Sequence, residues 1–514
     1  MTPTTQAVAD VERPAETAAT LVVRLSLPGR SWSQRLLSLP MVQGLALVSM
    51  LFFFSAAGGK AVHALADPDI WWHLRDASVL VHTRHFLRAD LYTYTVAGKP
   101  WINFEWMAEL PYYFAWQAMG DRGLYLVMML VAGAIVAGVY GLAWMRSGDP
   151  KSAFLASMAT VLFATVSLGP RTLLFGWLFL VVELGVLWSF QRGRDHTIWL
   201  PLLFLLWINT HGSWFIGFVL MAVFVACGFV GGEWGSVYAT RWTGAQARKL
   251  LGVMAASFAL LFVNPYGWRL VAYPLDVAFG QKLTLEYVAE WASLDFHNER
   301  GKLVLLVLLL FGVLQLVRRR RWSLQDLAFA LIAVYGAFTY VRFIFLAGIV
   351  VAPLLAMDLS GMLGPYEAKK DRRWPNAVAA ALLLGVVAFL YPTEKQLEAG
   401  VTASYPAQAI PVVRSLAGQG RLFNEFNWGA YLEWNAPQVP EFVDSRVDIF
   451  VHEGILRDYV RVAKIQDPYA VLDHYGIRYA LLARSNEAAY LLAHSADWKT
   501  IWSNPQGVLF ERVR

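Results

Sequence analysis

Two carboxylates at a fixed spacing are the first feature of the sequence that could do chemistry. Asp67 and Asp69 flank a proline, directly after a long apolar run and before the aromatic stretch IWW. No lysine next to them in the sequence neutralises their charge. Such a pair can supply oxygen ligands for a divalent cation, or act as a general base with an orienting partner. The sequence leaves both uses open and does not choose the base.

Other polar and ionisable residues gather near the ends of apolar runs. In chain order they are His73, Arg75, Glu105, Glu109, Arg171, Asn209, His211, Asn264, Tyr266, Glu290, Asp295, His297 and Arg342. Ionisable groups at membrane depth are costly, so they tend to mark the path of a substrate or ion. Ordinary explanations compete: turn chemistry at Asn264 and His211, solvated helix faces at Arg75, Glu105 and Glu109, and interfacial snorkelling at Arg342.

The composition indicates that these residues belong to a membrane protein. The chain has 514 residues, of which 57% are hydrophobic and 16% charged, with 22 tryptophans. Soluble domains carry about a quarter charged residues. The net charge of +6 comes largely from basic residues in short loops between apolar runs, which indicates topology and not a nucleic-acid partner. The single Cys227 excludes a disulfide framework and a cysteine metal site.

Apolar segments predict a bundle of about eleven transmembrane helices over residues 41–391, after a disordered or interfacial cytoplasmic lead-in at 1–40. The predicted spans are 41–59, 123–145, 152–169, 172–190, 198–210, 213–231, 251–264, 302–317, 323–341, 343–358 and 376–391. Several are shorter than the roughly 20 residues that cross a bilayer unaided. The shortest, 198–210 and 251–264, are expected to be tilted, packed inside the bundle or half re-entrant.

Basic residues set the expected orientation. With the N-terminus inside, every predicted inner loop is basic, as in the run Arg318–Arg321. This predicts an inner (cytoplasmic) membrane protein with a cytoplasmic N-terminus, long outer loops at 60–122 and 265–301, and an extracytoplasmic tail. Within the first outer loop, 70–82 and 104–117 have one apolar or aromatic face, which predicts helices lying in the interface.

The tail, 392–514, has shorter apolar stretches that predict a small α/β domain. Residues 475–483 and 507–513 are expected to be strands, and 453–464 a helix. The polar string DSRVD at 444–448 either recognises an acceptor or stabilises the tail through an internal ion pair. The second interpretation is favoured.

The order of features in 67–114 resembles the membrane-embedded glycosyltransferases of the GT-C class, which include protein mannosyltransferases, oligosaccharyltransferases and aminoarabinose transferases. An acidic start, an amphipathic helix, the turn GKPW at 98–101, and Glu105 before an aromatic helix follow that class's first outer loop. The stretches LWINTHG (206–212) and NPYG (264–267) resemble bacterial members, and RLFNEFNWGAYLEW (421–434) is loosely similar to the start of the oligosaccharyltransferase soluble domain. The Lys-Pro-Pro that follows the glutamate of aminoarabinose transferases is missing.

The resemblance implies a sugar donated from a polyprenyl phosphate or diphosphate at the outer face, to a glycan, lipid or protein acceptor of the cell envelope. Asp67 or Asp69 is then expected to be the base that deprotonates the acceptor, with Glu105 as a third catalytic candidate. Arg171 and Arg342 are expected to hold the leaving phosphate, because a guanidinium can bind two of its oxygens at once. His211 is expected to donate a hydrogen bond to it.

The remaining candidates would bind a metal or the sugar. If Mg²⁺ or Mn²⁺ takes part, Asp67 and Asp69, with His297 or Glu105, are the expected ligands; otherwise no cofactor is implied. Trp71 and Trp72 are expected to stack on a pyranose or to anchor in the headgroup region. His73, Asn264 and Tyr266 complete the expected substrate-binding set.

Three other functions fit parts of the pattern. An outer-face polysaccharide polymerase or ligase would depend on Arg171, His211 and Arg342 more than on the acidic pair. A transporter or lipid-linked sugar flippase should show paired repeats with broken helices, and these are not visible. A scaffold for envelope assembly leaves the acidic pair without a role. Glycosyltransfer is therefore the preferred hypothesis.

Overall fold

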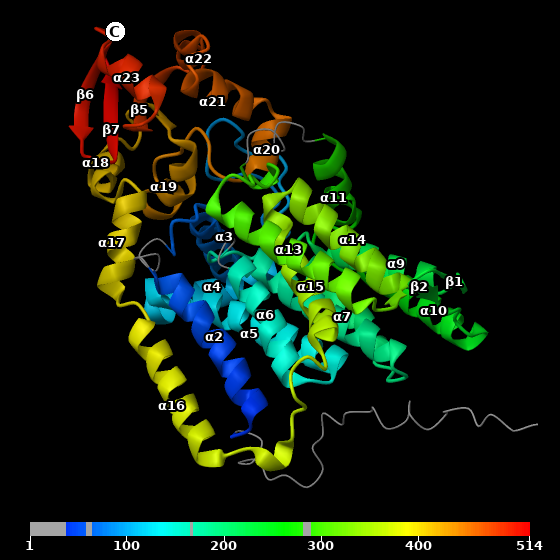
Figure 1. Ribbon diagram of the computed structural model, residues 1–514. Helices are drawn as coiled ribbons and strands as arrows, with labels where there is room; N and C mark the ends of the chain where they lie inside the picture. The colour runs from blue at the N-terminus through cyan, green and yellow to red at the C-terminus, as the bar shows by residue number, and fades with distance from the viewer. Residues whose placement is uncertain (1–36, 58–63, 165–167, 281–288, 514) are drawn as a thin grey trace, which may run out of the picture.

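The computed structural model describes residues 37–57, 64–164, 168–280 and 289–513. Each of the eleven apolar segments overlaps a helix of one bundle (Figure 1). These helices are α2 (Leu39–Ala56), α5 (Asp121–Ser147), α6 (Pro150–Ala164), α7 (Leu173–Gln191), α8 (Leu200–Ile208), α9 (Trp214–Cys227), α10 (Gly244–Leu260), α13 (Glu299–Arg318), α14 (Leu324–Thr339), α15 (Ile344–Leu359) and α16 (Arg373–Leu390). The expected all-helical bundle is confirmed.

The chain is a multi-pass membrane protein, but the expected count of eleven spans is not established. In the described residues, six helical stretches are long and apolar enough to cross a bilayer: Leu39–Ala56, Asp121–Ser147, Leu173–Gln191, Gly301–Arg318, Val341–Leu359 and Arg373–Leu390. Four shorter apolar helices accompany them, namely α6, Thr197–Ile208, α9 and α14. Helices this short fall below the roughly 20 residues that span a bilayer unaided.

The centre and the rim of the bundle differ in burial. Helix α15 packs against α5 and α6 in the centre, and 78% of the stretch Val341–Leu359 is buried. Helix α16 lies along α2 at the rim (Figure 1), and none of its residues is buried. Its Leu382 and Phe389 side chains are exposed, as expected for a helix surface that packs against lipid instead of protein.

The loop at 60–122, expected to be the first outer loop, contains the two expected helices, α3 (Asp69–Thr83) and α4 (Trp106–Met119). Helix α3 packs against α4 and also against α19 of the tail. Trp71 is in edge-on contact with Tyr405 and Tyr431, with ring centroids 5.7 and 5.0 Å apart. The tail therefore covers α3, which begins at Asp69 of the acidic pair.

The C-terminal part combines short helices with a four-stranded sheet of order β4-β5-β7-β6. Strands β4 and β5 are parallel, and the other two pairings are antiparallel. The expected strands at 475–483 and 507–513 are confirmed as β5 and β7, and the expected helix as α21. The elements are α17 (Glu394–Ser404), η6 (Ala407–Ala409), α18 (Ile410–Ser415), β4 (Arg421–Asn424), η7 (Phe426–Trp428), α19 (Gly429–Asn435), α20 (Val447–His452), α21 (Ile455–Ala463), α22 (Pro468–His474), β5 (Ile477–Ala483), α23 (Glu487–Ala493), β6 (Trp498–Ser503) and β7 (Gly507–Arg512).

The remaining elements join the helices at the two ends of the bundle. A small sheet of order β1-β2-β3, which the sequence did not predict, lies at the end away from the tail (Figure 1). Helix α11 lies at the same end as the tail. These elements are η2 (Thr197–Trp199), β1 (Gly232–Trp234), β2 (Val237–Ala239), α11 (Trp268–Gly280), η3 (Ala289–Trp291), β3 (Trp322–Ser323), η4 (Val341–Phe343) and η5 (Ala368–Lys370).

Candidate functional site

The two carboxylates of the acidic pair have different surroundings. Asp67 is buried before α3; its Oδ1 accepts a hydrogen bond from the Asp69 backbone N–H (3.1 Å), and its Oδ2 accepts one from Arg171 Nε. Both oxygens of Asp67 are therefore engaged. Asp69 is half-buried as the first residue of α3, and Trp72 Nε1 donates to its Oδ1 over a long 3.4 Å.

Arg171 connects three segments that are distant in the sequence. It lies in the turn before α7 and pairs with Asp67 and with Glu290 of the second outer loop. A Cβ on Gly169 would lie 3.1 Å from Asp67 Oδ2, so the glycine allows this close approach. Although burial opposes ionisation of Glu290, the charges of Arg171 and Arg342 hold its pKa below the usual value.

The electrostatics of Asp69 suit a base that works near neutral pH. Burial and the neighbouring charge of Asp67 raise the pKa of Asp69 to about 7. The nearby Ser445 hydroxyl and the charge of Arg171 act in the opposite direction. A carboxylate whose pKa lies near the working pH has the best balance between ionised fraction and proton affinity.

Glu105 lies between two histidines. Its Oε1 is 3.2 Å from His211 Nε2, and its Oε2 is 3.5 Å from His73 Nε2. The Ser213 backbone N–H donates to His211 Nδ1 (2.9 Å), so a neutral His211 carries its proton on Nε2, the nitrogen nearest Glu105. Burial lowers the pKa of His73 to about 3 and raises that of Glu105 to about 8. The Glu105 carboxyl thus lies within 3.5 Å of a ring nitrogen of each histidine.

A chain of hydrogen bonds continues from His73 into the outer loop. His73 Nδ1 is 3.1 Å from Glu109 Oε1, and Asn103 Nδ2 donates to Glu109 Oε2 (2.9 Å). The same amide donates to Asp76 Oδ2 (3.1 Å), and the Tyr92 hydroxyl donates to Asp76 Oδ1 (2.6 Å). The network fixes the start of α4 relative to α3.

Arg342 is a second cation near the acidic groups. It lies in η4, before α15, with its guanidinium carbon 4.4 Å from the centroid of the Trp291 ring. Its positive charge acts to lower the pKa of both Glu105 and Glu290. Within the described part of the chain no ion pair or hydrogen bond engages its guanidinium, which leaves N–H donors available for an anion.

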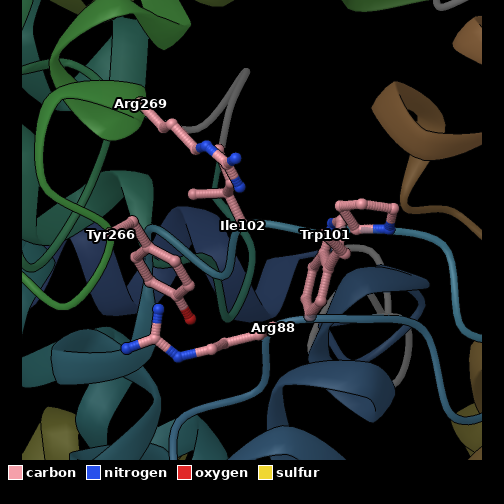
Figure 2. A pocket seen from close by; sticks show the side chains of 6 residues that line it. Arg88, Trp101, Ile102, Tyr266 and Arg269 are labelled. Carbon is pink, nitrogen blue, oxygen red and sulfur yellow. The ribbon is translucent and has the colours of Figure 1, made fainter.

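A cavity of about 460 Å³ lies near Trp72. It is lined by Arg88, Pro100, Trp101, Ile102, Tyr266 and Arg269 (Figure 2). In Figure 2 the Tyr266 ring lies between the guanidinium groups of Arg88 and Arg269. The Trp101 ring packs edge-on against Trp72, 5.7 Å between centroids, and Trp72 bonds Asp69. One aromatic ring therefore separates the wall of the cavity from the acidic pair.

Comparison with solved structures identifies this architecture. An Archaeoglobus fulgidus oligosaccharyltransferase matches with a TM-score of 0.52 and 14% identity, over 86% of this chain and 68% of that one. The same organism's AglB in complex with an inhibitory peptide and a dolichol-phosphate gives 0.53 and 12%, over 86% and 69%. ArnT from Cupriavidus metallidurans in the apo state gives 0.52 and 12%, over 91% and 96%. The chain has the GT-C fold. No family model and no curated protein matches it in sequence.

Within the GT-C fold, the expected sugar-binding residues divide into two kinds. Tyr266 lines the cavity, whereas Trp71 is 3% exposed and packs against the tail. Trp72 is also buried, between Asp69 and Trp101. Asn264 closes its own turn, donating to Leu261 O and Gly267 O and accepting from the Tyr266 backbone N–H.

The structure does not assemble Asp67, Asp69 and His297 into a metal site. His297 is fully exposed and pairs with Asp295 at 3.2 Å, and both oxygens of Asp67 are already engaged. In the part of the chain that the structure describes, one acidic triad has the spacing of a metal site: Glu433, Glu441 and Asp444 in the tail.

Several residues of this GT-C site were missed by sequence reasoning. Asn103 lies 6 positions before its partner Glu109 and 27 positions after its partner Asp76. No local sequence pattern links these residues, so Asn103 and Asp76 resemble ordinary loop and helix residues. Ser445 approaches Asp69 only because the tail folds back over α3. The DSRVD string was a visible signal, and its favoured interpretation as an internal ion pair agrees with the contact of Arg446 with Asp444 at 2.5 Å.

Proposed function

We propose that this protein is a glycosyltransferase that moves a sugar from a polyprenyl-phosphate-linked donor to an acceptor hydroxyl at the outer face of the membrane. In this proposal the N-terminus is cytoplasmic, and the C-terminal part and the cavity face outward. The acceptor belongs to the class of envelope glycans, lipids or proteins. The fold shared with glycosyltransferases supports the reaction class.

The observation that carries the proposal is the division of roles within the acidic pair. Arg171 and a backbone N–H hold Asp67, whereas Asp69 keeps a weakly engaged carboxylate with a raised pKa. We assign Asp69 as the base and Asp67 as the residue that positions Arg171. Glu105, between two neutral histidines, would orient the acceptor or the base.

The proposed step needs no further reactant. The acceptor oxygen forms a bond to the anomeric carbon, and the bond from that carbon to the phosphate oxygen breaks. The acceptor proton passes to the Asp69 carboxylate, and the electron pair leaves with the lipid phosphate. Arg342, whose guanidinium has donors available, stabilises the negative charge that develops there, and Arg171 assists from its position on Asp67. No part of this step is assigned to a metal.

The cavity is proposed to hold a part of the acceptor away from the reacting hydroxyl, since the Trp72 ring lies between the cavity wall and Asp69. Its walls combine two guanidinium groups with the Trp101 and Tyr266 rings, which suits a polar or anionic group on an aromatic surface. One of the related structures contains a dolichol-phosphate, which supports a lipid carrier for the donor, and another is tethered with an acceptor peptide, which supports a separate acceptor.

The test of the reaction class is transfer by purified protein in nanodiscs, from a pool of polyprenyl-phosphate sugars to a mixed pool of glycan, lipid and peptide acceptors. Release of lipid phosphate together with a glycosylated product is the expected result. Movement of the donor across liposomes without any product would overturn the proposal and favour a flippase. Transfer that depends on Arg171, His211 and Arg342 but not on Asp69 would favour a polymerase or ligase mechanism.

A further inference from the structure

A second group of buried carboxylates lies where the tail meets the first outer loop, apart from the acidic pair. Glu433 belongs to α19, and Glu441 and Asp444 lie in the segment between α19 and α20. One oxygen from each of the three falls within 4.8 Å of the others. Ligand oxygens about 2.4 Å from a Ca²⁺ ion lie at most about 4.8 Å apart, so three such ligands fit around one ion.

The hydrogen bonds of this triad are incomplete. Arg446 bonds both oxygens of Asp444 and reaches across to Asp90 of the outer loop (2.7 Å). Both oxygens of Glu433 and one of Glu441 have no hydrogen-bond partner among the described residues, although these two side chains are only 2% and 1% exposed. A buried polar atom without a partner costs about 1–3 kcal/mol, and more if it is charged.

Protonation does not resolve this deficit. Burial raises the pKa of Glu433 and Glu441 well above the usual value, which favours the neutral carboxyl. A neutral carboxyl still has an O–H that needs an acceptor, and neither oxygen of Glu433 has a partner. A bound group that contacts several oxygens at once would satisfy them together.

The balance of charge identifies the kind of group. The triad, Asp76 and Asp90 give five buried carboxylates, whereas Arg446 is the buried cation among them. Arg75 is half-buried and lines, with Glu433, Glu441 and Tyr92, an adjoining cavity of about 80 Å³. A divalent cation would stabilise the ionised carboxylates that burial disfavours, and the small cavity could hold its water ligands.

We propose that Glu433, Glu441 and Asp444 bind a hard divalent cation of the Ca²⁺ or Mg²⁺ class, which fastens the tail to the first outer loop. Carboxylate oxygens are the ligands these ions prefer. The ion would fix the segment that carries Ser445 next to Asp69. The site is structural, so it does not depend on the proposed function.

The test is the metal content and melting temperature of the full-length protein, purified in detergent without chelator. Wild type is compared with Glu433→Gln and Glu441→Gln, and with Glu487→Gln as a control at an exposed carboxylate. About one equivalent of divalent metal is expected in wild type, in the control and in Asp69→Asn, and less than a tenth of that in the two triad variants. EDTA should lower the wild-type Tm by several degrees, and CaCl₂ or MgCl₂ should restore it.

Three results would overturn this proposal. The first is wild-type protein without bound metal whose Tm responds to neither EDTA nor added cation, a measurement that needs no variant. The second is metal that stays in the triad variants but is lost in Asp69→Asn, which places the ion at the acidic pair. The third is that the triad variants lack metal and melt above wild type, which would show that the wild-type carboxylates repel one another with no ion between them.

Discussion

Arg171 donates through Nε to Asp67, whereas Asp69, two residues further on, forms no ion pair with any residue that the structure describes. The guanidinium also pairs with Glu290, so one side chain joins the start of α3, the turn before α7 and the second outer loop. Because Arg171 binds Asp67, while burial and the charge of Asp67 raise the pKa of Asp69, the two carboxylates of the motif have different surroundings. This difference is the basis for assigning them different roles.

Asp67→Asn should destabilise the protein more than Asp69→Asn. The change removes the buried partner of Arg171 and leaves it paired with Glu290 alone. We expect a loss of about 1–3 kcal/mol in the free energy of unfolding. This is less than for a fully buried pair, because the Arg171 side chain is 28% exposed and solvent screens its charge. Thermal melting would measure the difference. Asp295→Asn, at an exposed outer-loop carboxylate, is the matched control and should melt like wild type. Equal melting of Asp67→Asn and wild type would show that the pair does not hold the loops.

The rate of transfer should rise with pH through about 7. Asp69 accepts a proton only when ionised, and its pKa is raised to about 7, so the active fraction falls about tenfold for each pH unit below that value. Initial rates between pH 5.5 and 8.5, with Tm measured at each pH, would define this acidic limb. A profile that is flat from pH 6 to 8 would contradict the assignment.

The raised pKa of Asp69 also predicts that the stability contributed by this residue falls as the pH rises, whereas the rate of transfer increases. A carboxyl whose pKa is higher in the folded state than its ordinary 3.8 favours folding when protonated, and this contribution is lost as the pH rises through about 7. Asp69→Asn removes the ionisation, so its Tm relative to wild type should increase between pH 5 and pH 8. Melting curves at the two pH values test this. A decrease would mean that the native protein favours the ionised form.

Arg446→Gln should strongly destabilise the C-terminal part. The change leaves Asp90 and Asp444 buried without their cation, and loss of one member of a buried charge group costs about 3–5 kcal/mol. Urea or thermal unfolding would measure it, with Arg461→Gln as the control because that arginine pairs at the surface. Similar stabilities of the two variants would remove the argument that Arg446 docks the tail.

Arg342→Ala should lower the rate of transfer at least a hundredfold without a large change in Tm. Its guanidinium bonds no described residue, so the folded protein loses mainly its contact with the Trp291 ring. Arg342→Lys should recover part of the rate, since it keeps the charge but not the two-point contact with phosphate. If Arg342→Ala lowered the rate only as much as it lowered the fraction of folded protein, Arg342 would have a structural role alone.

The sequence predicted the elements well and their contacts poorly. Periodic apolar runs predicted the bundle helices, the helices α3 and α4, and the strands β5 and β7, because these depend on local pattern. Asp69, Arg171 and Arg342 were named as candidates because charge near an apolar run is conspicuous. The pairing of Asp67 with Arg171 spans 104 residues, and that of Arg446 with Asp90 spans 356, so no local pattern shows them. The tail's cover over α3 was missed for the same reason.

The central claim, that Asp69 is the base of an outer-face glycosyltransferase, is tested most directly by Asp69→Asn in the nanodisc transfer assay. Asparagine keeps the size of the side chain but cannot accept the proton. We expect transfer to fall at least a hundredfold, while donor binding stays close to wild type and the Tm at pH 7 does not fall below that of wild type. Transfer by Asp69→Asn within about threefold of wild type, from a folded protein, would contradict the account.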